Sequence, residues 1–325
     1  MRIVRNTFFA SLLLSAAAFA AVDSALLNLV PPDATIISGI QVDQSRTSKF
    51  GQYVLSQMSP NDPGMMKFIT DTGFDPRRDL NELVVASVGI PPASQMIVVG
   101  KGIFNPTKIM TAAVTTAGAT VITYNGIPLL THQDAGRNGA LAFIGSSTAL
   151  MGTLDAVKAA IDRSHGGTHL NADLQAKAQS LAAANDAWFV STGPITNLFG
   201  GTSTDKSVNS VMNGNLLQAV LSANGGVKFG SQTIVVSGEA VTRSDKDATA
   251  LADVIRFIAG LVQTNQDGSA QAQQAASLLG GLQLSTQAST MKLSLSLPEA
   301  TMEQLFMSMP HGKAPKAVAS LNVRK

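Results

Sequence analysis

Two hydrophobic patterns alternate along the chain, and together they predict strands and helices in turn. Runs rich in β-branched residues, such as ATIISGIQ from Ala34 and QMIVVGKG from Gln95, are typical of strands. From Ser244 the apolar residues instead recur three and four positions apart, between Leu251 and Val262, which is the spacing of an amphipathic helix that packs on a sheet. The pattern therefore indicates an α+β fold.

Capping and turn residues mark the limits of several elements in the first half of the chain. Asp62-Pro63 and Asn105-Pro106 each combine a capping side chain with a proline at the first helical position. Gly73 and Gly118 are expected to end these two helices. Asn125-Gly126 lies between two apolar runs and predicts a β-hairpin. A further helix is expected between Ser45 and Met58.

The stretch TALMGTLDAVKAAIDRS, from Thr148 to Ser164, predicts a strand followed by a helix. Thr153 is placed to cap this helix, and Asp155 in its first turn suits the helix dipole. The residues expected to face the sheet are Leu154, Val157 and Ile161. The residues expected to face solvent are Lys158, Asp162 and Arg163. We therefore interpret the charges in this stretch as a solvated helix face, not as a catalytic group.

The second half of the chain, from Asn171, repeats the element order of the first half. Both halves show strand, helix, strand, strand, helix, hairpin and helix. In the second half, helices are expected from about Leu216 to Ala223, from Ser244 and after Pro298, and a Gln/Ala-rich helix is expected from Gln263 to Gly281. A shared order of this length indicates an internal repeat.

Short matching motifs support this repeat. Ile97-Val98-Val99 and Ile234-Val235-Val236 fall in equivalent strands, and Thr153 and Pro298 open equivalent helices. We therefore predict two tandem modules, residues 26–170 and 171–309, each a mainly antiparallel sheet with helices on one face.

The N-terminus has the layout of a secretory signal peptide. Arg2 and Arg5 precede an apolar run, and Ala18 and Ala20 form an A-x-A cleavage site. The run is short for a membrane span of about 20 apolar residues, so cleavage after Ala20 is predicted, and an uncleaved anchor is the alternative. The mature protein would then be exported, to the periplasm or the medium.

Composition excludes some classes of partner. Loss of residues 1–20 removes two arginines and no acid, which leaves 21 basic and 21 acidic residues. A neutral chain with 5% aromatic residues lacks the basic surface and the stacking residues of nucleic-acid binders. The last 16 residues, 310–325, carry a local basic excess and are expected to form a flexible tail. Contact with a membrane is expected only through this tail or an uncleaved signal.

The chain contains no cysteine. Disulfides, thiolate metal sites, cysteine nucleophiles and a lipidated cysteine are therefore excluded. A domain without disulfides must be stabilised by its hydrophobic core, and a chain of this length can bury enough surface for that as two domains.

Catalytic motifs are weak. His132 and Asp134 are two residues apart near a strand end and form the one conceivable His-Asp pair, but no nucleophile motif accompanies them. His165 and His169 have zinc-helix spacing, yet Gly166-Gly167 between them disfavours a helix. The S-x-x-K match at Ser203 to Lys206 lies in a polar loop without its companion motifs. We therefore predict no catalytic residue, no metal site and no cofactor.

Three segments carry a resemblance to a known group of proteins. LVPPDATIISGIQ, GFDPRRDLNELVVAS and ALMGTLDAVKAAID, together with the export signal, resemble uncharacterised bacterial envelope proteins with repeated α/β modules. The resemblance covers most of the mature chain at the level of pattern. It implies an envelope location and a repeated α/β fold, and it supplies no established activity or site residue.

These observations favour an exported, non-catalytic envelope protein that binds an envelope protein or an apolar small molecule. Two alternatives stay open. One is a carrier of a lipid or other apolar ligand, in a groove lined by the adaptable methionines Met302, Met307 and Met309. The other is an envelope hydrolase that uses His132 and Asp134.

Overall fold

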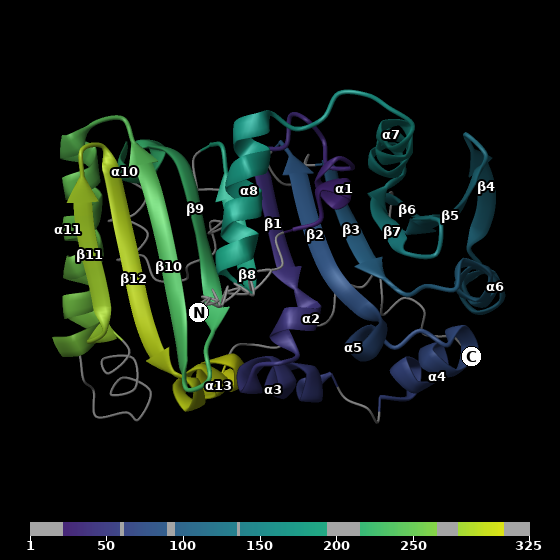
Figure 1. Cartoon of the computed structure of the whole chain (residues 1–325), viewed down its shortest axis with the longest axis horizontal. Helices are drawn as coiled ribbons and strands as arrows, with labels where there is room; N and C mark the ends of the chain where they lie inside the picture. Colours follow the sequence, from purple (N-terminus) through teal and green to yellow (C-terminus); the bar gives the residue numbers. More distant parts are fainter. Residues whose placement is uncertain are drawn as a thin grey trace, which may run out of the picture.

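The computed structural model describes residues 22–58, 62–89, 95–134, 137–193, 215–264 and 279–308. These residues form one 12-stranded sheet in the order β11-β12-β10-β9-β8-β1-β2-β3-β7-β6-β5-β4, with helices packed against it (Figure 1). Every pairing of neighbouring strands is antiparallel. The protein is therefore an α+β protein built on a large antiparallel sheet, as the sequence predicts.

The strands of the first half are β1 (Ile36–Gln41), β2 (Leu80–Val88), β3 (Gln95–Gly102), β4 (Thr120–Tyr124), β5 (Ile127–Asp134), β6 (Arg137–Ile144) and β7 (Thr148–Thr153). Those of the second half are β8 (Ala187–Ser191), β9 (Val220–Phe229), β10 (Thr233–Thr242), β11 (Leu282–Gln287) and β12 (Thr290–Pro298). The helices are α1 (Ser24–Leu27), α2 (Val42–Ser45), α3 (Lys49–Gln57), α4 (Pro63–Thr72), α5 (Pro76–Asp79), α6 (Pro106–Ala117), α7 (Leu154–Ser164), α8 (Ala172–Ala184), α10 (Asn215–Gln218), α11 (Asp245–Thr264) and α13 (Glu299–Ser308).

The predicted capping residues define α4, α6 and α7. The Asp62 side chain accepts a hydrogen bond from the Met65 backbone N–H, and Asn105 caps α6 in the same way. Gly73 and Gly118 end these helices with φ angles of 74° and 62°, in the left-handed region that favours glycine. Thr153 caps α7. These helix limits are confirmed.

The two halves of the chain meet at the centre of the sheet, where β1 pairs with β8. Gly39 lies opposite Trp188, the one tryptophan of the chain. A Cβ atom at Gly39 would lie 2.6 Å from the Trp188 ring, so only glycine fits there without movement. The halves therefore share one continuous sheet.

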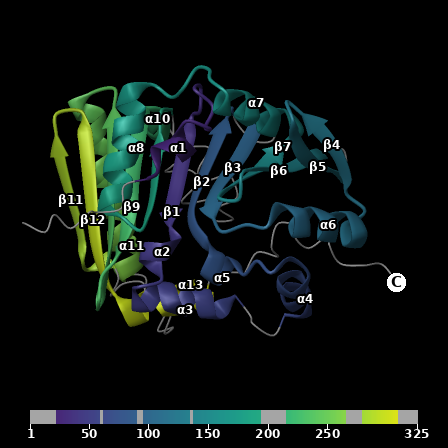
Figure 2. The same ribbon diagram turned by 45° about the vertical axis from the view of Figure 1, so that its right-hand side comes forward.

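The two faces of the sheet are named here after the helices that cover them. On the α8 face, α1, α7 and α8 pack on a core that includes Ile97, Leu150 and Trp188. On the α11 face, α11 packs on the second half through Leu251 and Ala252. Figures 1 and 2 show α8 and α11 on opposite sides of the strands. Each face is thus covered by helices over part of its width.

The predicted placement of helices on one face is wrong for both halves, since α8 and α11 of the second half lie on opposite faces, and the first half shows the same. Ile109 of α6 packs on Phe143, whereas Val157 of α7 packs in the core that contains Ala142 and Leu150. Phe143 and Ala142 are consecutive in β6, so their side chains lie on opposite faces and the two helices do too (Figure 2).

Two helix limits also differ from the prediction. The helix expected from Leu216 to Ala223 ends at Gln218, and β9 begins at Val220, because pairing with β8 and β10 on both sides extends this segment. The helix expected between Ser45 and Met58 begins only at Lys49, as α3, and the separate helix α2 ends at Ser45; Ser48 caps α3 by accepting a hydrogen bond from the Gly51 backbone N–H.

Several predictions concern residues outside the described ranges. They are the signal peptide with Ala18 and Ala20, most of the helix expected from Gln263 to Gly281, the Ser203–Lys206 motif and the tail 310–325. Of the helices in the described ranges, none combines the length and the hydropathy that a membrane crossing requires.

Candidate functional site

A groove of about 550 Å³ lies on the α8 face, between α8 and strands β8, β9 and β10. One wall is α8, whose Asp173, Leu174 and Lys177 are one and four positions apart and so share a stripe of the helix. Asn171 starts this helix, since its side chain accepts a hydrogen bond from the Asp173 backbone N–H at 2.8 Å. The loop that contains Pro32 and Asp33 also lines the groove.

Buried alanines on the neighbouring side of α8 fix this wall against the sheet. Ala178 and Ala182 are fully buried and belong to the same core as Trp188 and Val190. Small alanine side chains allow the helix to approach the strands closely, and alanine has the highest helix propensity. The alanine-rich sequence of α8 therefore serves both the formation of the helix and its position beside the groove.

Strand register builds the floor of the groove. Val190 of β8 lies opposite Asn224 of β9, Asn224 lies opposite Glu239 of β10, and Glu239 lies opposite Lys292 of β12. Directly opposite residues in an antiparallel sheet project on the same face. One row of neighbouring side chains therefore runs from an apolar residue, through an amide and a carboxylate, to an amine.

Glu239 is the centre of a polar network in this row. Its Oε2 atom lies 3.1 Å from Lys177 Nζ and accepts a hydrogen bond from Asn224 Nδ2 at 3.3 Å, and its Oε1 atom lies 3.4 Å from Lys292 Nζ. Partial burial alone would raise the pKa of Glu239, but the hydrogen bonds from Lys177, Asn224 and Lys292 lower it overall. Glu239 is therefore held as a carboxylate.

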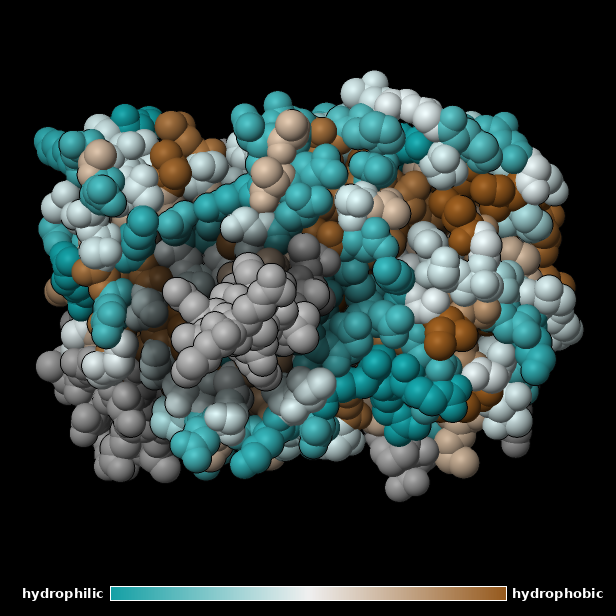
Figure 3. Space-filling view, in the orientation of Figure 1, coloured by the Kyte–Doolittle hydropathy of each residue, from teal (hydrophilic) through white to brown (hydrophobic). Residues whose placement is uncertain are grey.

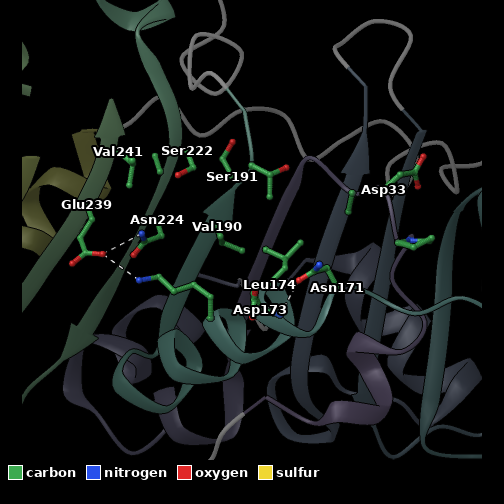
Figure 4. Close-up of a pocket in the computed structure, with 15 residues that line it drawn as sticks. Asp33, Asn171, Asp173, Leu174, Val190, Ser191, Ser222, Asn224, Glu239 and Val241 are labelled. Atoms are coloured by element: carbon green, nitrogen blue, oxygen red, sulfur yellow. Dashed lines mark hydrogen bonds and ion pairs between the residues drawn. The ribbon is translucent and has the colours of Figure 1, made fainter. Parts of the chain in front are cut away.

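Figure 4 shows the groove from above its floor. Glu239 and Asp33 lie toward opposite ends, and the apolar side chains of Val190 and Leu174 lie between them. In the part of the chain that the structure describes, no lysine, arginine or histidine nitrogen is paired with Asp33 or Asp173 within 4.0 Å. The lining thus combines the Glu239–lysine network, an apolar middle and two carboxylates without a direct ion pair, and Arg163 is near enough to Asp33 to interact with it electrostatically.

The described lining residues do not form a catalytic set. None of them is a histidine, and the Ser191 hydroxyl donates to the Gly193 carbonyl oxygen at 3.0 Å. Glu239 is a poor general base, because its pKa is lowered. The groove is suited to hold a ligand by charge, by hydrogen bonds to hydroxyl and amide groups, and by apolar contact.

The histidines singled out in the sequence lie away from this groove. His132 is exposed near the end of β5, opposite Gly139, and the side chain of Asp134 is outside the described set. His165 Nδ1 lies 2.9 Å from the Ile161 carbonyl oxygen at the end of α7, and His169 Nδ1 lies 3.3 Å from that of Asn28. In the described ranges, no three or more acidic or histidine side chains gather so that they could bind a metal ion.

Sequence reasoning did not identify the groove. The available signal was Glu239 within the strand sequence VVSGEAVT, since a charged residue in the middle of a strand needs a partner. Its partner Asn224 lies in a segment partly predicted as helix, and Lys177 comes from a third segment. The register of β9 and β10 and the docking of α8 bring these residues together.

No family model matches the sequence, and no curated protein matches it. Among solved structures, crystal form III of TP0453 aligns with a TM-score of 0.51 and 8% sequence identity, over 89% of this chain and 99% of that chain. Crystal form IV of TP0453 aligns with a TM-score of 0.50 and 8% identity, over 87% and 96% of the two chains. At this identity the similarity shows the fold alone.

Proposed function

We propose that the protein is an exported, non-catalytic binding protein of the bacterial envelope, and that its ligand occupies the groove between α8 and β8–β10. The observation that carries this proposal is the lining of the groove, which is open, combines carboxylates with apolar side chains, and shows no pair of nucleophile and base among its described residues. The lack of any histidine there and the lowered pKa of Glu239 both favour binding over catalysis.

Charge in the groove selects the class of ligand. Lys177 and Lys292 together exceed the charge of Glu239 by one, so that end of the groove is positive, whereas Asp33 and Asp173 make the rest of the groove negative. A ligand with a positive group can pair with these carboxylates, and its apolar part can contact Leu174 and Val190. We infer a basic peptide segment or another amine-bearing molecule as the ligand.

Calorimetric titration tests this proposal. An alanine-based peptide with a lysine at each end is expected to bind, and the same peptide with glutamate at each end is expected not to bind. The double variant Asp33→Asn/Asp173→Asn should weaken binding of the lysine peptide at least tenfold, about 1.4 kcal/mol. Increasing salt should weaken binding too, because these carboxylates are exposed.

Asp155→Asn is the matched control. Asp155 is also an exposed acid in the first turn of a helix, but it belongs to α7 and does not line the groove. This variant should bind the lysine peptide as the parent does. Equal binding of the two peptides, or equal weakening by Asp155→Asn, would contradict a role for the groove carboxylates.

The export part of the proposal rests on the N-terminal sequence. N-terminal sequencing of the mature chain should begin at Ala21, and fractionation should place the chain in the periplasm or the medium. Recovery of the intact N-terminus in the cytoplasm would exclude the envelope role.

The tandem modules 26–170 and 171–309 remain part of the proposal. The strand order outward from the β1–β8 pair supports them: β1-β2-β3-β7-β6 on one side and β8-β9-β10-β12-β11 on the other. The motifs Ile97–Val99 and Ile234–Val236 then occupy the third strand of each set. Superposition of the two sets in this order tests the repeat, and a poor fit would contradict it.

A row of apolar side chains on the α11 face favours the second candidate, a carrier of an acyl chain or similar apolar ligand. Register places Val85, Val98, Met151 and Leu141 side by side across β2, β3, β7 and β6. Met151 is 45% exposed, and Met96, two residues from Val98 on the same face, is 48% exposed. Methionine side chains adapt readily to apolar ligands.

A fluorescent fatty acid distinguishes this candidate from the groove proposal. If the apolar row binds the acyl chain, Met151→Glu should abolish binding. Met307→Glu is the control, because Met307 is also exposed but lies on α13. Of the methionines singled out in the sequence, Met302 is half-buried and Met309 lies outside the described residues. Loss of binding only in Met307→Glu would move the site to α13.

A further inference from the structure

The two edges of the sheet differ in how their backbone groups are protected. At one edge, α11 packs beside β11, and Arg256 Nη2 donates a hydrogen bond to the Leu284 carbonyl oxygen at 3.4 Å. At the other edge lies β4, and no strand of the described ranges pairs with its outer side. An unprotected edge is a template for another strand.

The register of the β4–β5 hairpin fixes which groups of β4 point outward. Asn125 and Gly126 form a two-residue turn with positive φ angles, so the flanking pair Tyr124 and Ile127 is hydrogen-bonded. Such pairs alternate, so the backbone groups of Ile122 face β5 and those of Val121 and Thr123 face away from it. Thr123 lies opposite Pro128, which has no N–H to donate, in agreement with this alternation.

The outward groups of β4 are complementary to a second copy of themselves. We propose that the protein associates with itself by antiparallel pairing of β4 with β4 of another copy, about a two-fold axis at Ile122. In this register Val121 of one copy lies opposite Thr123 of the other, and both pairs are hydrogen-bonded. Ile122 lies opposite its own counterpart, so the interface is isologous, as in most dimers.

The surroundings of β4 fit this association. The hairpin from Thr120 to Thr131 contains no Asp, Glu, Lys or Arg, so the paired strands themselves place no like charges opposite each other. Val121 is 45% exposed, and Figure 3 shows apolar residues gathered at the end of the molecule where β4 lies. Tyr124 Oη and Asn125 Nδ2 donate hydrogen bonds to the Asp162 carboxylate, which fixes the hairpin to α7.

Sedimentation equilibrium of the purified protein tests the proposal. The protein is expected to show a concentration-dependent monomer–dimer equilibrium. Thr123→Pro removes an outward N–H and leaves the bonds to β5 in place, so it should weaken the dimer at least tenfold without unfolding the chain. If this variant does not fold, Val121→Lys replaces it, because a charge on the edge opposes pairing.

Thr286→Pro is the matched control at the opposite edge. By the same alternation, counted from the hydrogen-bonded pair Gln287 and Thr290, the backbone groups of Thr286 point outward from β11. This variant should associate as the parent does. A parent protein that stays monomeric up to millimolar concentration would overturn the proposal, as would equal weakening by the two proline variants.

A disulfide test identifies the register. The chain has no cysteine, so Ile122→Cys introduces a single thiol at the proposed two-fold axis. The Cα separation in a pair without backbone hydrogen bonds is suited to a disulfide. Mild oxidation should link Ile122→Cys into dimers. The control Ser285→Cys, at the corresponding position of β11, should stay mostly unlinked. Equal linkage of the two would contradict pairing through β4.

Discussion

Rows of residues on the α11 face, taken outward from the β1–β8 pair, differ between the two halves of the sheet. In the second half, the row across β8, β9, β10 and β12 consists of Phe189, Gly225, Gly238 and Leu293. In the first half, the row across β1, β2, β3 and β7 consists of Ser38, Val85, Val98 and Met151. Two glycines in one row thus correspond to two valines in the other.

The two rows also differ in how far other parts of the protein cover them. A Cβ atom added at Gly225 would lie 3.1 Å from the Phe189 ring, and one added at Gly238 would lie 3.4 Å from Leu293, so these large side chains lie over the glycines. Phe189 and Leu293 then pack against the cluster that contains Leu251 of α11. In the first half Met151 remains 45% exposed.

On the α8 face, by contrast, the first half is the part that helices cover more fully. There α1 and α7 cover an apolar first half, and the second half carries the row Asn224, Glu239 and Lys292 beside the groove. The uncovered part of this face is polar, and the least covered part of the other face is apolar. The sheet thus offers two surfaces of opposite chemistry, which supports a polar ligand for one and an apolar ligand for the other.

The seam between the halves, where β1 pairs with β8, is the place where substitutions are expected to lower the free energy of unfolding most. Trp188→Ala removes a side chain that is 3% exposed, which should lower the free energy of unfolding by about 3–5 kcal/mol. Urea denaturation followed by circular dichroism measures this loss. A single transition in the parent and two in the variant would show that the seam makes the halves cooperative.

Gly39→Ala tests the same seam from β1. The added Cβ would lie 2.6 Å from the Trp188 ring, so the variant should lose about 1–3 kcal/mol by overpacking. Gly139→Ala is the control, because the nearest atom to its added Cβ, the His132 carbonyl oxygen, is 3.8 Å away. In a Trp188→Ala background, Gly39→Ala should cost much less, and an unchanged cost would disprove the contact.

The next largest effect on the free energy of unfolding is expected in the covered row of the second half, compared with the exposed row of the first half. Leu293→Ala should lower the free energy of unfolding by about 2 kcal/mol, because Leu293 packs against the α11 cluster. Met151→Ala at the corresponding position should cost less than about 1 kcal/mol, because Met151 is 45% exposed. Thermal and urea denaturation of the two variants give this ratio. Equal losses would mean that Met151 is covered in solution.

Local signals in the sequence were sufficient for much of the fold. Asp62-Pro63, Asn105-Pro106 and Asn125-Gly126 predicted two helices and a hairpin, because capping and turn chemistry involves only neighbouring residues. The start of β9 at Val220 was not predicted, since that strand is determined by partners on both sides.

The groove was not predicted for the same physical reason. Lys177, Asn224 and Glu239 come from three separate segments, and their proximity depends on strand register and on the docking of α8. A periodic pattern shows which face of a strand is apolar, but it does not show which polar residues of distant strands become neighbours.

Two carboxylates on the α8 face, one in each half of the sheet, differ in the direction in which their pKa is shifted. Glu82 of β2 is 5% exposed, and its carboxylate accepts hydrogen bonds from Gln41 Nε2 at 2.8 Å and the Asp23 backbone N–H at 3.3 Å. Burial raises the pKa of Glu82, with the nearby charge of Asp23 adding to this effect. Glu239 in the second half instead has a lowered pKa.

A raised pKa for Glu82 has a defined consequence for stability. Its contribution is fully present below the ordinary pKa of 4.5 and is lost as the pH rises through the raised value. Glu82→Gln imitates the protonated form, so the variant should gain stability relative to the parent as the pH rises from 4 to 8. Urea midpoints across this range measure the difference. A constant difference would exclude Glu82 as its source.

The same substitution at Glu239 should give a smaller effect of opposite sign. The stability that Glu239 contributes is present above its ordinary pKa of 4.5 and is lost as the pH falls through the lowered value. Because its side chain is 33% exposed, Glu239→Gln should cost at most about 1 kcal/mol at neutral pH and nothing in strong acid. Lys177→Met combined with Glu239→Gln should cost less than the sum of the two single changes, since they share one ion pair. If the costs are additive, the ion pair between Lys177 and Glu239 contributes nothing measurable to stability.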